Sequence, residues 1–123
     1  MMKTILIVDD DVAILELLKD ILSEEGYQTV CAGDGLKALH VVDEADVDLV
    51  ISDINMPNLN GAELVTVLRQ RPKTKKTPVL ALTSLPEMRR STDKSFAAIL
   101  HKPFKLEELV ETVKMLLYPR MTS

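Results

Sequence analysis

Residues 4–10 read Thr-Ile-Leu-Ile-Val-Asp-Asp, an unbroken aliphatic run that ends on two carboxylates. A run without polar alternation is typical of a strand that is buried on both faces, as in a parallel sheet. Residues 12–25 then repeat apolar side chains at helical spacing, and Gly26 ends that pattern. The chain therefore opens with one strand followed by one helix, and this unit guides the interpretation of the rest.

The same unit recurs along the chain. Apolar runs predict further strands at 27–32, 47–52, 78–83 and 97–101. Helical patterns follow at 36–45, at 61–70, from Pro86 onward and at 106–117. This alternation predicts an α/β fold, a doubly wound five-stranded parallel sheet flanked by five helices.

Composition and length favour one soluble domain. The 123 residues are 46% hydrophobic, enough for a buried core, and we expect one domain over 1–123 with a core at about 3–117 and a tail at 118–123. Cys31 is the only cysteine, so we expect a packed core thiol and a cytoplasmic location. No apolar run approaches the roughly 20 residues of a membrane span. The net charge of −4 and the 3% aromatic content argue against direct binding of nucleic acid.

Reactive side chains lie at the ends of four of the predicted strands. Asp9 and Asp10 follow the first, Asp53 follows the third, Thr83 ends the fourth and Lys102 follows the fifth. The carboxyl ends of parallel strands share one edge of the sheet, where open α/β sheets bind their ligands. We therefore expect these side chains to meet in one crevice.

Three carboxylates in one crevice call for a cation, because like charges would otherwise keep one of them protonated. Oxygen ligands favour Mg²⁺ over softer metals. Lys102 adds a positive charge for an anion, and the carboxylate of Asp53 can act as a nucleophile toward a phosphoryl group. Thr83 can donate a hydrogen bond to a bound phosphoryl oxygen. The pattern predicts a magnesium-dependent phosphoryl-transfer site.

Four ordered motifs carry a resemblance to a known family. They are Val8-Asp9-Asp10-Asp11, Asp53-Ile54-Asn55-Met56-Pro57 with Gly61, Leu82-Thr83-Ser84 and Lys102-Pro103-Phe104. From Thr4 to Leu117 the chain resembles the response-regulator receiver family of two-component signalling. The resemblance implies a chemotaxis-receiver-like, flavodoxin-like sheet of strand order 2-1-3-4-5 and a cis peptide bond before Pro103.

The resemblance also implies roles in phosphorylation. Asp53 is expected to accept a phosphoryl group from a phosphohistidine, on a sensor histidine kinase or a histidine phosphotransfer protein. Lys102 is expected to contact that group, and Thr83 to move toward it and carry the signal to an output domain or a downstream protein. Such a protein phosphorylates only itself and is not a turnover enzyme, although slow autophosphatase activity is expected.

The implied cofactor is Mg²⁺. The resemblance implies that Asp10 binds it directly, Asp9 mainly through water, Asp53 through its carboxylate and Asn55 through its backbone carbonyl. Aspartates before a helix often only cap it, but Asp11 lies closest to the first helical run. Asp11 is therefore the expected cap, which leaves Asp9 and Asp10 for the metal.

Two positions depart from the pattern of the family. Ile99 stands where the family usually carries Tyr or Phe, and the segment from Thr83 to Lys102 is shorter by about one helical turn. Both departures fall on the surface that the family often uses for its partners. We expect the signal to leave through an altered face, or the response to phosphorylation to be weak.

Two other functions stay open at this point. A haloacid-dehalogenase-type phosphohydrolase also uses an aspartate at a strand end, but it needs a second aspartate where Asn55 stands. A phosphate-independent pseudo-receiver would keep the fold as a protein-binding module, and Ile99 is compatible with that role. Incubation with Mg²⁺ and acetyl phosphate separates these functions from a phosphorylation switch.

Overall fold

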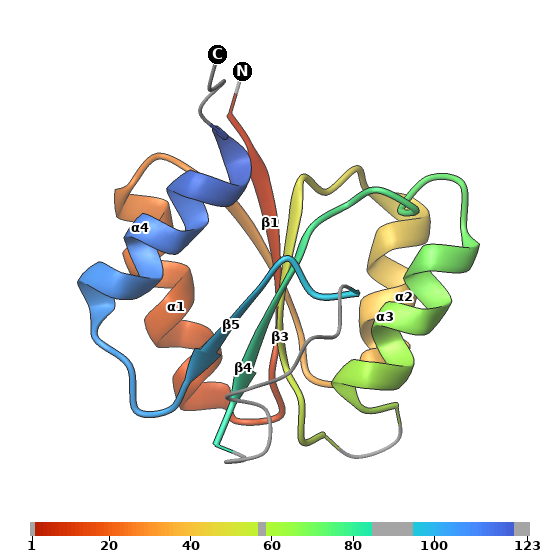
Figure 1. Cartoon of the computed structure of the whole chain (residues 1–123), viewed down its shortest axis with the longest axis horizontal. Helices are drawn as coiled ribbons and strands as arrows, with labels where there is room; N and C mark the ends of the chain where they lie inside the picture. The colour runs from red at the N-terminus through yellow and green to blue at the C-terminus, as the bar shows by residue number, and fades with distance from the viewer. Residues whose placement is uncertain (1, 57–58, 85–94, 120–123) are drawn as a thin grey trace.

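The computed structural model describes residues 2–56, 59–84 and 95–119 (Figure 1). Five strands lie in these segments: β1 (Thr4–Val8), β2 (Gln28–Ala32), β3 (Leu49–Asp53), β4 (Val79–Thr83) and β5 (Ala98–His101). The same segments hold four helices: α1 (Val12–Glu24), α2 (Gly35–Glu44), α3 (Gly61–Gln70) and α4 (Leu106–Leu117). The additional helix expected from Pro86 onward falls outside the described residues.

The five strands form one parallel sheet in the order β2-β1-β3-β4-β5, which confirms the expected fold and topology. Helices α1 and α4 cover one face, and α2 and α3 cover the other (Figure 1). The strand order reverses at β1, which pairs with β2 on one side and with β3 on the other. The carboxyl ends of β1 and β3 therefore flank the point at which such sheets bind ligands.

The side chains of each strand alternate between two buried clusters. On β1, Ile5 and Ile7 join the cluster under α1 and α4, whereas Leu6 and Val8 join the cluster under α2 and α3. Every residue of β3 and β4 is buried. Burial on both faces explains why the opening strand is aliphatic throughout, without polar alternation.

One expectation about the core is wrong. Cys31 is exposed, although it was expected to be a packed thiol. It pairs with the fully buried Ile7, so it lies on the same face of the sheet as α1. However, β2 is an edge strand, where the helix layer leaves part of this face of the sheet exposed to water. An apolar run alone does not distinguish an edge strand from a central one.

Caps fix the start of three helices. Asp11 accepts a hydrogen bond from the backbone N–H of Ala13 at 2.9 Å, which confirms it as the cap of α1. Asp34 accepts one from Lys37 N–H at 2.8 Å and caps α2. Asn60 forms a reciprocal capping box with Glu63 at the start of α3. These caps hold the helices close to the strand ends, where the candidate site lies.

Candidate functional site

Three carboxylates meet at the carboxyl ends of β1 and β3. Asp9 and Asp10 directly follow β1, and Asp53 is the last residue of β3. Oxygen atoms of all three lie within 4.8 Å of one another. Asp9 and Asp53 are buried, with 1% and 8% of their surface exposed, whereas Asp10 is exposed. The structure thus brings together the three acidic residues that the sequence singled out.

Lys102, which follows β5, places its ammonium group beside two of these carboxylates. Its Nζ lies 3.5 Å from Asp9 Oδ2 and 3.4 Å from Asp53 Oδ2. Its backbone N–H donates to the carbonyl of Thr83 at 2.8 Å, and the Lys102–Pro103 peptide bond is cis, as expected. One ammonium group is therefore shared between two buried carboxylates, and it neutralises only part of their charge.

Burial raises the pKa of the Asp9 carboxyl above its ordinary value of 3.8. A hydrogen bond from Asp11 N–H and the positive charge of Lys102 act in the opposite direction, and the nearby carboxylate of Asp53 adds to the increase. Desolvation is thus the dominant cause. A divalent cation beside Asp9 would favour its ionised form and offset this cost.

This pKa predicts how stability depends on pH in the absence of metal. Folded Asp9 holds its proton more tightly than unfolded Asp9, so ionising it costs the folded state free energy. The free energy of unfolding of the wild type minus that of Asp9→Asn should therefore fall as the pH rises from 3.8 through the raised pKa. Urea unfolding in EDTA at a series of pH values measures this difference. A difference that stays constant or rises with pH would contradict a raised pKa of Asp9 in the folded state.

The loop after β3 is closely fitted to the end of that strand. Asn55 N–H donates to Asp53 Oδ1 at 3.2 Å, and Gly61 N–H donates to the carbonyl of Ile54 at 3.1 Å. A Cβ on Gly61 would lie only 2.7 Å from the carbonyl oxygen of Asp53. The backbone that directly follows Asp53 is therefore fixed by hydrogen bonds and close contacts.

The other predicted residues lie around this cluster. Thr83 is buried at the end of β4, next to β3 in the sheet. Met56 packs against the cluster under α2 and α3. His101 pairs with Thr83 in the sheet, and its Nε2 is buried without a hydrogen-bond partner among the described residues.

Gly35 was missed as a candidate for this site. It follows Asp34 just before the helical run at 36–45, and an Asp-Gly pair in that position is typical of a turn. In the structure it is buried at the start of α2 against Leu59, in the stretch between β3 and α3. The sequence holds no signal for this approach, because the two residues are close only in the folded sheet.

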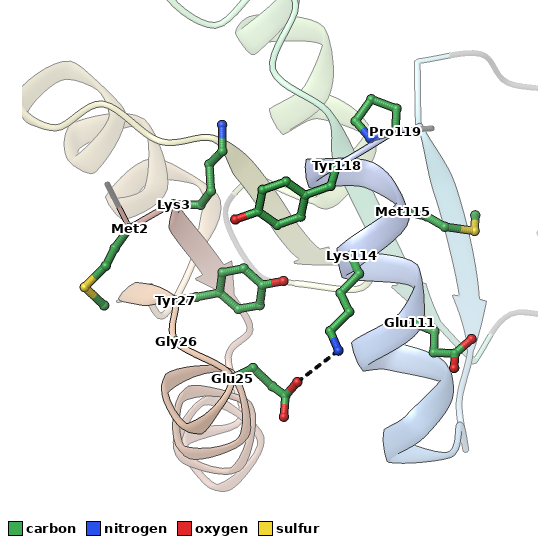
Figure 2. A pocket seen from close by; sticks show the side chains of 10 residues that line it. All are labelled: Met2, Lys3, Glu25, Gly26, Tyr27, Glu111, Lys114, Met115, Tyr118 and Pro119. Atoms are coloured by element: carbon green, nitrogen blue, oxygen red, sulfur yellow. Dashed lines mark ion pairs between the residues drawn. The ribbon is translucent and has the colours of Figure 1, made fainter. Parts of the chain in front are cut away.

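A separate groove lies at the opposite end of the strands, where β1 begins. It has a volume of about 1210 Å³ and lies between the start of the chain and the last turns of α4 (Figure 2). Tyr27 and Tyr118 lie beside it, and Lys3 Nζ is 5.9 Å from the ring centre of Tyr118. No acidic-cluster residue lines this groove, so it is distinct from the candidate site.

The ion pair that crosses this groove is expected to contribute little to stability. Lys114 Nζ lies 3.4 Å from Glu25 Oε1, and both side chains are substantially exposed (Figure 2). Exposed pairs of this kind are typically worth about 0–1 kcal/mol. Lys114→Ala should therefore lower the free energy of unfolding in urea by less than about 1 kcal/mol. A larger loss would mean that Lys114 stabilises the groove through packing.

Fold and site together define an α/β protein with an acidic, lysine-containing site at the strand-order switch point. Residues 5–114 match the model of the response regulator receiver domain. The chain belongs to this family. Its members pair with histidine kinases, and the class is a receiver rather than a turnover enzyme.

Known proteins agree with this assignment. The chain is 39% identical over 119 residues to transcriptional regulatory protein CpxR of Escherichia coli (strain K12), covering 94% of this chain and 50% of that protein. It thus spans about half the length of the curated relatives that it matches. Chemotaxis protein CheY4 of Vibrio cholerae superposes with a TM-score of 0.87 at 35% identity, covering 95% and 100% of the two chains.

A third relative was crystallised with a ligand. Response regulator TrrA of Thermotoga maritima, in complex with Mg(2+)-BeF, superposes with a TM-score of 0.83 at 40% identity, covering 94% of this chain and 100% of that one. In this chain, the oxygen donors of the acidic cluster suit a hard divalent cation. None of the helices in the described segments has the length and apolar character that crossing a bilayer requires.

Proposed function

We propose that this chain, as one domain over residues 1–123, is a phosphoacceptor receiver of a two-component phosphorelay. A phosphohistidine on a sensor histidine kinase or a histidine phosphotransfer protein donates a phosphoryl group to Asp53. The observation that carries the proposal is Lys102 Nζ, held within 3.5 Å of both Asp9 and Asp53 inside the acidic cluster. Burying two carboxylates beside one lysine costs free energy, whereas a phosphoryl-transfer site uses a nucleophile and positive charge that stabilises the transferring group.

Each residue has a distinct task in this proposal. A carboxylate oxygen of Asp53 attacks phosphorus, the bond between phosphorus and the donor imidazole nitrogen breaks, and the imidazole leaves with the electron pair. Lys102 lies beside the attacking carboxylate and can balance charge on the phosphoryl oxygens. Thr83, at the end of the neighbouring strand, donates a hydrogen bond to the phosphoryl group once it is bound. Its shift toward that group carries the signal.

The donor set fits Mg²⁺ as the cofactor. Asp9, Asp10 and Asp53 would hold it with their carboxylates, directly or through water, and Asn55 with its backbone carbonyl. The bound cation would neutralise charge on the phosphoryl oxygens during transfer. The complex of TrrA with Mg(2+)-BeF supports the same use of this site here.

Incubation with acetyl phosphate, followed by intact-mass measurement, tests the proposal. We expect one phosphoryl group per chain in Mg²⁺, none in EDTA, and slow loss of the group through autophosphatase activity. Steady release of phosphate from many phosphate esters would instead indicate a phosphohydrolase. No gain with any small donor or with a phosphohistidine protein would favour a pseudo-receiver that binds partners without phosphate.

The output of the switch is proposed to differ from that of most receivers. Ile99 pairs with Ala81 and packs against the cluster under α2 and α3, and it offers neither a ring nor a hydroxyl to a partner. An output domain or a downstream protein would then read another surface. Amide exchange with and without phosphorylation tests this, and large protection changes across 95–100 on phosphorylation would contradict it.

A further inference from the structure

Two of the four glycines lie so close to neighbouring backbone that neither has room for a side chain. A Cβ added at Gly26 would meet nothing within 4 Å, and one at Gly33 would meet only Lys37 Nζ at 4.0 Å. At Gly61 it would lie 2.7 Å from the carbonyl oxygen of Asp53, and at Gly35 it would lie 2.7 Å from Leu59 Cβ and closer still to the Leu59 carbonyl oxygen. Gly61 is therefore crowded by backbone at the end of β3, and Gly35 by the backbone of Leu59, two residues before α3.

Gly35 cannot easily move away from Leu59. It is the first residue of α2, and the preceding Asp34 fixes the helix start through Lys37 N–H. Ala38 and Val42 hold the helix in the cluster under α2 and α3, against which Leu59 also packs. Real Cβ atoms essentially never come within 3.0 Å of a heavy atom from a residue that is distant along the chain. A side chain at Gly35 would therefore have to displace the backbone of Leu59.

A displacement of Leu59 would also shift the backbone around Asn55, the residue expected to offer its carbonyl to the metal. The next residue, Asn60, caps α3 through a hydrogen bond from Glu63 N–H at 2.8 Å. Gly61 N–H donates a hydrogen bond to the carbonyl of Ile54, the residue between Asp53 and Asn55. The hydrogen-bonded start of α3 therefore joins Leu59 to the backbone that carries Asn55.

We propose that Gly35 is a positioning residue for the magnesium site. Its lack of a side chain lets Leu59 pack against the start of α2, and this contact sets where the loop after β3 places the carbonyl of Asn55. The inference rests on the proposed function, because it assumes that the acidic cluster binds Mg²⁺. It adds a residue of α2 that touches neither the metal nor the phosphoryl group.

The free energy of unfolding, measured in urea with EDTA and with excess Mg²⁺, tests this role. The gain in stability on adding Mg²⁺ reports the affinity of the folded site, separately from any change in the metal-free fold. Gly35→Ala should weaken Mg²⁺ binding roughly tenfold, the lower end of what outer-shell changes cause, and so reduce the gain by about 1.4 kcal/mol. The matched control is Gly33→Ala, where a Cβ has room.

Each outcome decides a separate point. A reduced gain in Gly35→Ala with an unchanged gain in Gly33→Ala supports the proposal. An equal gain in Gly35→Ala and the wild type overturns it, even if the variant is less stable in EDTA. No gain in the wild type refutes the metal site itself. Should Gly35→Ala be unfolded in water, it is measured with trimethylamine N-oxide, which favours folding. Failure to fold there also overturns the proposal, since Gly35 would then hold the whole domain.

Discussion

Asp53→Asn should take up no phosphoryl group from acetyl phosphate and Mg²⁺ under conditions in which the wild type takes up one. The amide is nearly the same size as the carboxylate, so the buried end of β3 is kept. Its neutral oxygen is a poor nucleophile, and the variant also loses the charge that faces Lys102. The substitution should therefore remove the proposed acceptor without removing the fold.

The matched control for this experiment is Asp20→Asn, on the exposed side of α1. It makes the same chemical change outside the acidic cluster and should be phosphorylated like the wild type. Thermal unfolding of both variants checks that the fold is intact. Uptake of a phosphoryl group by Asp53→Asn at the wild-type rate would show that another side chain is the acceptor.

Lys102→Met should slow phosphorylation by acetyl phosphate roughly a hundredfold, the usual effect of removing one preorganised group that stabilises a transition state. Methionine keeps the unbranched stem of the side chain but leaves Asp9 and Asp53 without their shared ammonium group. Because Lys102 lowers the pKa of Asp9, the variant should also bind the Asp9 proton more tightly. The chemistry and the titration of Asp9 should therefore change together.

Lys105→Met is the control for this variant. Lys105 is exposed at the start of α4, three residues along the chain from Lys102. Its replacement should leave the rate of phosphoryl uptake unchanged, as measured by intact mass over time. A Lys102→Met variant that reacts at the wild-type rate would remove Lys102 from the site, however close it lies to the carboxylates.

The sequence was sufficient to predict the strands, because the aliphatic runs of the central strands reflect burial on both faces. The strand order was predicted from the family resemblance. All five strands and the helices in the described segments were found within about two residues of their expected ends. One shift matters for the site. The third strand was expected to end at residue 52, but Ile54 N–H donates to Leu82 O, so the ladder continues through Asp53. The proposed acceptor, Asp53, is therefore a strand residue on a rigid element.

The site was predictable to the extent that parallel strands bring their carboxyl ends together. Asp9, Asp10, Asp53 and Lys102 converge for that reason. The sequence could not show that Lys102 is shared between two carboxylates, since this depends on side-chain geometry. Nor could it show the contact of Gly35 with Leu59 or the exposure of Cys31, which depend on helix placement and on the edge of the sheet.

The most direct test of the account is to locate the phosphoryl group after transfer. Borohydride reduces an acyl phosphate to the alcohol and releases phosphate, so a phosphorylated aspartate becomes homoserine, which peptide mass spectrometry can place in the sequence. The wild type, treated with Mg²⁺ and acetyl phosphate and then reduced, should carry homoserine at residue 53 and at no other aspartate. Homoserine at Asp9 or Asp10, or at no position despite a phosphoryl gain in intact mass, would contradict the account.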